Sequence, residues 1–144
     1  MTKILVVHGA GINMRGKVAV DVFGPETMDD YNRVIHEFAD ELGISVEIFH
    51  SNIQGEIVNA FYAAHDGDID AAVINPAGFT ASAPALVAAI GQVRFPTVEV
   101  HITNPTARGN NSSVSPACKG VVLGFGLEGY YLALHGAKYF AEKA

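Results

Sequence analysis

The sequence has one cysteine, few basic residues and no long apolar run, and each shortage excludes a class of protein. Cys118 cannot form an internal disulfide, and no acid or histidine stands beside it, so we interpret it as structural. The opening apolar run, Ile4 to Val7, is far shorter than a signal-peptide core or a membrane-spanning helix. We therefore expect a cytoplasmic protein with no membrane partner.

Charge and composition argue against a nucleic-acid-binding protein and for a compact domain. The chain has 9 Lys and Arg against 15 Asp and Glu, a net charge of −6, and no basic cluster, so nucleic acid is not an expected partner. Its 144 residues are 49% hydrophobic and 17% charged, without low-complexity segments. A chain of this size and composition predicts a single compact domain over residues 1–144.

Apolar segments of strand length alternate with segments of helical spacing. The expected strands are 4–7, 44–49, 71–74, 97–102 and 120–123, and the expected helices are 27–42, 56–65, 82–90 and 127–142. This alternation predicts an α/β fold with a five-stranded, parallel, doubly wound sheet in the flavodoxin-like order 2-1-3-4-5. Residues 9–25, rich in glycine and without a period, are expected to form a long functional loop.

Local signals set two boundaries. Thr27 and Asp30 resemble a capping box at the start of the first helix, and Gly43 is expected to end it. Residues 44–49 alternate apolar and polar, which is typical of a half-exposed edge strand.

The segment Glu99-Val100-His101 ends the fourth expected strand and places two ionisable side chains on the same face. In a doubly wound sheet, ligands bind beyond the carboxyl ends of the strands. A histidine there could exchange a proton with a ligand, and the carboxylate could fix its tautomer. A structural histidine at a strand end is an equally good interpretation of this pattern.

Two further motifs have competing interpretations. Asn75 to Thr80 ends the third strand and offers an amide and backbone N–H groups for an oxyanion or a water, or is simply a capped turn. Residues 124–129 fit the pattern GxGxxG, but they follow the last strand, so a tight turn with close helix packing is favoured over a dinucleotide site. The six histidines are too scattered to predict a metal site.

A set of short, distinct motifs is distributed over nearly the whole chain. They are Ile4-Leu5-Val6-Val7-His8-Gly9, Asn13 and Gly16, Ser51-Asn52 with Gly55-Glu56, Ile74-Asn75-Pro76, Glu99-Val100-His101, Ala107-Arg108, Ser115-Pro116, Lys119-Gly120-Val121 and Gly124-Phe125-Gly126. Together these motifs resemble the type II 3-dehydroquinate dehydratases. The resemblance implies a flavodoxin-like enzyme that needs no cofactor and assembles as a homo-oligomer, a dodecamer of four trimers.

The resemblance also implies catalytic roles. In that family a strand-end asparagine holds a water that stabilises an enolate, and a histidine braced by a glutamate protonates the departing hydroxyl; these residues correspond to Asn75, His101 and Glu99. The family's base is a loop tyrosine activated by an arginine, and these positions correspond to Phe23 and Val18. The acid half of the machinery is therefore present, and the base half is absent.

Recognition residues differ as well. The family has glycine-proline-asparagine after its first strand, where this chain has Gly9-Ala10-Gly11. The family's tyrosine and histidine after the third strand correspond to Phe79 and Ala81, and its aspartate on the next helix corresponds to Ala88. The loop after Arg108 is shortened and lacks the second arginine that would hold a substrate carboxylate. The residues we expect to contact the substrate are His8, Asn13, Asp21, Phe23, Gly78, Ile102, Thr103 and Arg108.

Three functions follow from these features. The leading hypothesis is a diverged lyase or hydrolase that uses His101 on a small carbonyl, lactone or hydroxy-acid metabolite other than 3-dehydroquinate. The alternatives are 3-dehydroquinate dehydration by a substitute base, and a non-catalytic oligomeric binding protein. Candidate substitute bases are His8, Asp21, and Arg15 or Lys17 acting through water.

Overall fold

A computed structural model of the protein describes residues 1–143, and it contains the predicted five-stranded parallel sheet. The strands are β1 (Lys3–Ala10), β2 (Ser45–His50), β3 (Ala71–Ala77), β4 (Thr97–His101) and β5 (Gly120–Leu123). Their order is β2-β1-β3-β4-β5, and every neighbouring pair is parallel. The flavodoxin-like α/β prediction is confirmed.

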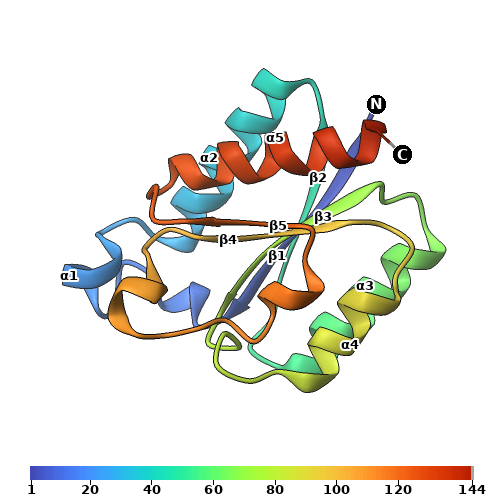
Figure 1. The fold of residues 1–144 in the computed structure, drawn as a ribbon. Helices are drawn as coiled ribbons and strands as arrows, with labels where there is room; N and C mark the ends of the chain where they lie inside the picture. The colour runs from blue at the N-terminus through green and yellow to red at the C-terminus, as the bar shows by residue number, and fades with distance from the viewer. Residues whose placement is uncertain (144) are drawn as a thin grey trace.

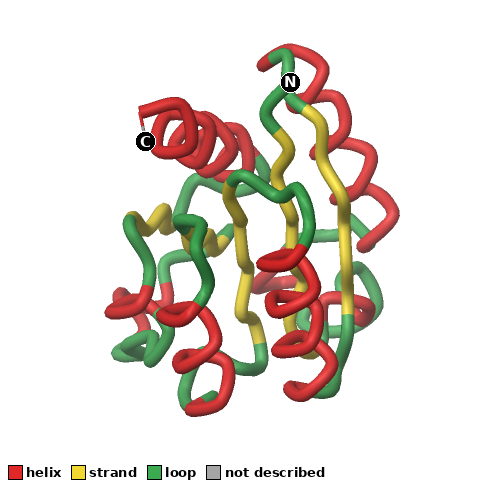
Figure 2. Tube along the Cα trace, turned by 90° about the vertical axis from the view of Figure 1, so that its right-hand side faces the viewer, coloured by secondary structure: helices red, strands yellow, loops and turns green. Residues whose placement is uncertain are grey.

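Helices cover both faces of the sheet (Figure 1). One face carries α2 (Met28–Leu42) and α5 (Glu128–Lys143), and the other carries α3 (Gln54–Asp66) and α4 (Pro84–Gln92). In the view turned by 90°, the strands run through the middle of the molecule with helices around them (Figure 2). No helix within residues 1–143 has both the length and the apolar composition needed to cross a membrane.

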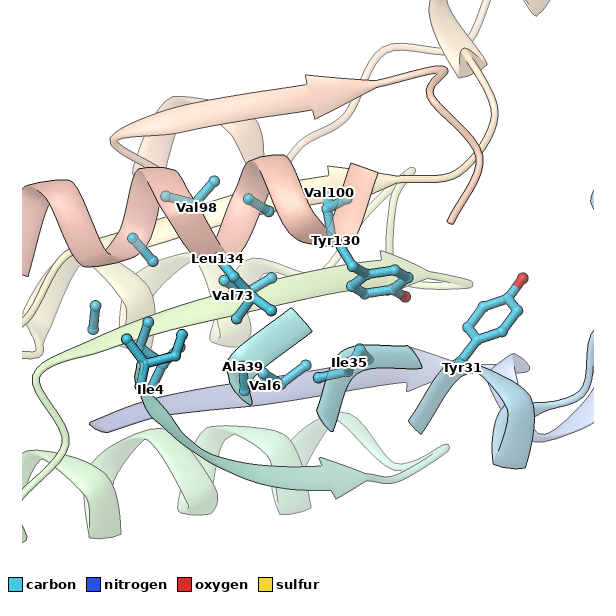
Figure 3. Packing of buried hydrophobic residues seen from close by; sticks show 14 of the residues in the cluster. Ile4, Val6, Tyr31, Ile35, Ala39, Val73, Val98, Val100, Tyr130 and Leu134 are labelled. Atoms are coloured by element: carbon cyan, nitrogen blue, oxygen red, sulfur yellow. The ribbon is translucent and has the colours of Figure 1, made fainter. Parts of the chain in front are cut away.

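The core consists of two apolar clusters, one on each face of the sheet. The central strands β1 and β3 contribute to both clusters, because their side chains alternate between the two covered faces. The cluster beneath α2 and α5 ends at Tyr31 and Tyr130, near the arrowheads of the strands (Figure 3). Strand β2 is only partly buried, as the sequence predicted for an edge strand.

Both predicted boundaries of α2 are confirmed. The Thr27 side-chain oxygen accepts the Asp30 backbone N–H (3.2 Å), and Asp30 Oδ2 accepts the Thr27 N–H (2.9 Å). Gly43 ends the helix with a φ of 67°, a conformation that glycine adopts without the steric cost of a Cβ atom.

The segment after β1 differs from the sequence-based expectation. Strand β1 continues to Ala10, because it remains paired with β3 as far as Ala77. A Cβ at Gly9 would lie 2.1 Å from the Pro76 carbonyl oxygen, so glycine allows the two strands to approach closely. The following loop also contains a 3-10 helix, η1 (Ile12–Met14), and the short helix α1 (Val20–Phe23).

The glycine motif between β5 and α5 is a turn, as predicted. Gly124 and Gly126 have φ values of 89° and 61°. A Cβ at Gly129 would lie 3.4 Å from Val100 Cγ2, so α5 begins in close contact with β4. These features account for the motif through backbone conformation and packing.

Candidate active site

A cavity of about 540 Å³ opens at the carboxyl ends of the strands, where ligands bind in folds of this type. Its wall includes the end of β1, the loop that follows, the ends of β3 and β4, and the two loops after them. Seven of the predicted site residues line it: Phe23, Asn75, Gly78, His101, Ile102, Thr103 and Arg108. The fold thus brings together residues that are up to 85 positions apart (108 − 23).

His101 lines the cavity and is paired with Glu99, which lies behind it. Nε2 of His101 is hydrogen-bonded to Glu99 Oε2. The Glu99 side chain is fully buried, whereas that of His101 retains 9% of its exposure. The two residues share a face of β4 because side chains two apart on a strand point to the same side. With Nε2 paired, Nδ1 is the ring nitrogen left for a ligand.

The hydrogen bonds around Glu99 keep it charged. Burial by itself raises the pKa of this carboxyl, but hydrogen bonds from His101, Ser112 and Ser115 outweigh burial and hold the pKa below its usual value. The Ser115 hydroxyl donates to Glu99 Oε1. Sequence reasoning did not assign these serines a role, although Ser115 stood within one of the family motifs. A charged carboxylate beside His101 orients the imidazole ring.

Asn75 is held in place from both ends of its amide. Its Nδ2 donates to the Tyr130 hydroxyl (3.1 Å), and its Oδ1 accepts the Ala77 backbone N–H (3.2 Å). The side chain is 2% exposed and lines the cavity. Since Nδ2 carries two hydrogens, one remains for a ligand or a water. Tyr130, from α5, was not predicted as part of the site.

Phe23 occupies the cavity wall beneath an arginine. The Arg15 guanidinium carbon lies 3.6 Å from the centroid of the Phe23 ring, and both residues line the cavity. A phenyl ring has no ionisable group, so Phe23 cannot take a proton. Val18 is 52% exposed and does not line the cavity.

His8 lies in the interior and does not line the cavity. Its ring packs edge-on against Tyr31 and Tyr130, with centroid distances of 6.4 and 6.2 Å. Nε2 of His8 donates to Asn32 Oδ1 (2.7 Å). Burial lowers the pKa of His8 to about 4, although the bond to Asn32 opposes this effect. The prediction that His8 faces the ligand is not met, because β1 continues past it and α2 covers it.

Asn13, Lys17 and Asp21 also lie away from the cavity wall. Lys17 and Asp21 are exposed, Asp21 on α1, and Asn13 lies in η1 with a buried Oδ1. The sequence could not show this, because the unperiodic loop gave no direction to its side chains. Of the four candidate substitute bases, only Arg15 lines the cavity.

The single cysteine shows no sign of reactivity. Burial raises the pKa of the Cys118 thiol to about 12, and the charge of Glu99 adds to this rise. Its side chain packs at the edge of the core cluster beneath α3 and α4. These features agree with a structural role. Among residues 1–143, no three His, Cys, Asp or Glu side chains lie close enough together to hold a metal ion.

The chain is similar to a known family of proteins over nearly its whole length. Residues 2–138 match the family described as Dehydroquinase class II. The chain belongs to this family. A curated relative from Caldanaerobacter subterraneus, named 3-dehydroquinate dehydratase, is 39% identical over 99% of this chain and 97% of its own. Another relative of that name, from Desulforudis audaxviator, is 39% identical over 94% of this chain and 91% of its own.

Solved structures of family members superimpose closely on this dehydroquinase-family chain. A type II dehydroquinase from Butyrivibrio crossotus has a TM-score of 0.91 at 30% identity, covering 95% of this chain and 97% of its own. A 3-dehydroquinate dehydratase-like protein from Bifidobacterium longum has a TM-score of 0.76 at 30% identity, covering 99% of each chain. The reaction class of the family is that of a dehydratase, a type of lyase.

Proposed function

We propose that this protein is a lyase-type enzyme in which His101 transfers a proton to or from a small carbonyl or hydroxy-acid compound. The supporting observation is the buried, charged Glu99 bonded to a histidine that lines a cavity. A buried carboxylate is costly unless its partners compensate. Its presence beneath the cavity suits a group that must stabilise a protonated imidazole during a reaction.

In the proposed elimination, protonated His101 gives its Nδ1 proton to a hydroxyl of the substrate. The carbon–oxygen bond breaks, water leaves, and a carbon–carbon double bond forms as a second water molecule in the cavity takes a proton from the adjacent carbon. The negative charge of Glu99 favours the imidazolium before transfer and orients the ring throughout. Asn75 offers one N–H to an oxygen that becomes negative.

We further propose that 3-dehydroquinate is not an efficient substrate. Phe23 cannot act as a base and Val18 cannot activate one, whereas a general base typically contributes 10²- to 10⁴-fold, or about 3 to 5 kcal/mol of transition-state stabilisation. The alternative is 3-dehydroquinate dehydration by a substitute base, and the 38–39% identity to relatives of that name favours it.

Two measurements test these proposals. The ultraviolet absorbance of the conjugated product measures 3-dehydroquinate turnover, for which we expect a negligible rate. Proton nuclear magnetic resonance of a panel of β-hydroxy carbonyl acids detects elimination as new vinyl signals. His101→Ala should then lower any turnover by about 10²- to 10⁴-fold. His36→Ala is the matched control, because His36 is exposed on α2 and outside the cavity wall.

The outcomes separate the alternatives. Rapid 3-dehydroquinate turnover would promote the substitute-base alternative over the proposal. A loss of less than about threefold in His101→Ala, with unchanged circular dichroism, would make His101 a structural residue. Failure of the whole panel, together with inactivity on 3-dehydroquinate, would support the non-catalytic binding protein.

A further inference from the structure

Arg15 is held in an unusual position for a loop residue. Its guanidinium lies on the face of the Phe23 ring, 3.6 Å from the centroid. An aromatic face attracts a cation and restricts where it can lie. Arg15 follows η1 and Phe23 ends α1, so this contact joins the two helical turns of the loop after β1.

The charge of Arg15 has no acidic partner. Within residues 1–143, none of the ion pairs includes Arg15, and its buried Nε makes no hydrogen bond. Burial raises the pKa of the Tyr31 hydroxyl, and the charge of Arg15 lowers it in part. A buried guanidinium N–H without an acceptor is costly. The buried Nε is out of reach of a ligand, so an anionic oxygen in the cavity would pair with the terminal guanidinium nitrogens of Arg15.

The charged side chains of the cavity wall are positive, which suits an anionic ligand. Its only charged side chains within the described residues are Arg15 and Arg108, and no Asp or Glu lines it, although the chain carries a net charge of −6. Arg108 is held at the rim, where its Nη1 donates to Thr103 Oγ1 (2.9 Å). Two guanidinium groups in a cavity without carboxylates favour a small anionic ligand.

We propose that Arg15 binds the anionic oxygen of the substrate, and that Phe23 is a positioning residue that fixes the guanidinium for this contact. The inference rests on the proposed function, which it deepens by naming the residue that binds the negative charge of the substrate. The phenyl ring at position 23 cannot act as a base, but in this proposal it has a second role. The ring supports a cation that stabilises negative charge while His101 handles the proton.

Oxalate, a small planar dianion, serves as the probe. Arginine Nε–H resonances are recorded in a proton–nitrogen correlation spectrum, and the Arg15 signal is assigned by its disappearance in Arg15→Lys. We expect a saturable shift of this signal, and at least about a tenfold weaker Kd in Arg15→Lys, since a lysine lacks the planar fork that pairs with a carboxylate. Arg33→Lys is the matched control, because Arg33 is exposed on α2.

The positioning role of Phe23 has its own readout. Phe23→Leu removes the aromatic face and should weaken oxalate binding severalfold, whereas the conservative Phe23→Tyr keeps the face and should restore most of the affinity. An Arg15 signal that does not move in the unmodified protein overturns the proposal, whether or not the variants fold. Equal losses in Arg15→Lys and Arg33→Lys also overturn it.

The same titration in His101→Ala separates this inference from the proposed reaction. If the Arg15 signal shifts but the unmodified protein turns over no substrate, the anion site is supported and the proposed reaction is contradicted. If turnover requires His101 but the Arg15 signal does not shift, the proposed reaction is supported and the anion site is contradicted.

Discussion

Glu99→Gln removes one negative charge beneath the cavity and nearly preserves the size of the side chain. Glu99 is fully buried, and its two oxygens accept hydrogen bonds from His101 and Ser115. A hydrogen bond to a charged group contributes roughly 1.5–3 kcal/mol, about twice a neutral one. Replacing both charged bonds with neutral ones should therefore lower the free energy of unfolding by about 1–3 kcal/mol at neutral pH.

The loss should depend on pH in a defined direction. The pKa of Glu99 lies below its usual value of 4.5 because its hydrogen bonds outweigh the effect of burial. A carboxyl with a lowered folded-state pKa contributes stability that is present above the unfolded pKa and is lost as the pH falls through the folded pKa. The difference between Glu99→Gln and the unmodified protein should therefore be largest above pH 4.5 and shrink below it.

Urea denaturation at about pH 7 and about pH 4 measures the difference directly. Glu47→Gln is the control, because Glu47 is a half-exposed strand residue whose partner, Lys3, lies 2.9 Å away at the surface. The control should change little at either pH, since exposed ion pairs contribute little. A Glu99→Gln difference that is below about 0.5 kcal/mol at pH 7, or that is equal at both pH values, would refute the charged, hydrogen-bonded state assigned to Glu99.

Two further predictions concern the assembly and the backbone. Light scattering should show a dodecamer, or at least a trimer, as the family resemblance implies; a monomer at micromolar concentration would contradict this expectation. Gly9→Ala should destabilise the protein by more than about 3 kcal/mol, because the added Cβ would lie 2.1 Å from a backbone oxygen of Pro76. Gly136→Ala, on α5 with nothing within 4 Å of the new Cβ, should instead be stabilising, so similar thermal melts for the two variants would disprove the close approach of β1 and β3.

Local patterns were sufficient where the relevant physics is local. The capping box at Thr27 depends on residues three positions apart, and the Gly124 turn depends on backbone conformation at the glycines themselves. Glu99 and His101 were paired correctly because alternation along one strand determines which side chains share a face. In each case the interacting groups lie within a few residues of one another.

The sequence by itself determined the strand order, the four longer helices and the position of the cavity at the carboxyl ends of the strands, but not the short helix α1. Only the tertiary structure decided which polar residues face that cavity. His8 and Arg15 both belong to the segment around the end of β1, but α2 covers His8, and the Phe23 ring holds Arg15 in the cavity wall. Such contacts join side chains from separate elements, and neither periodicity nor spacing encodes the direction of a side chain in an irregular loop.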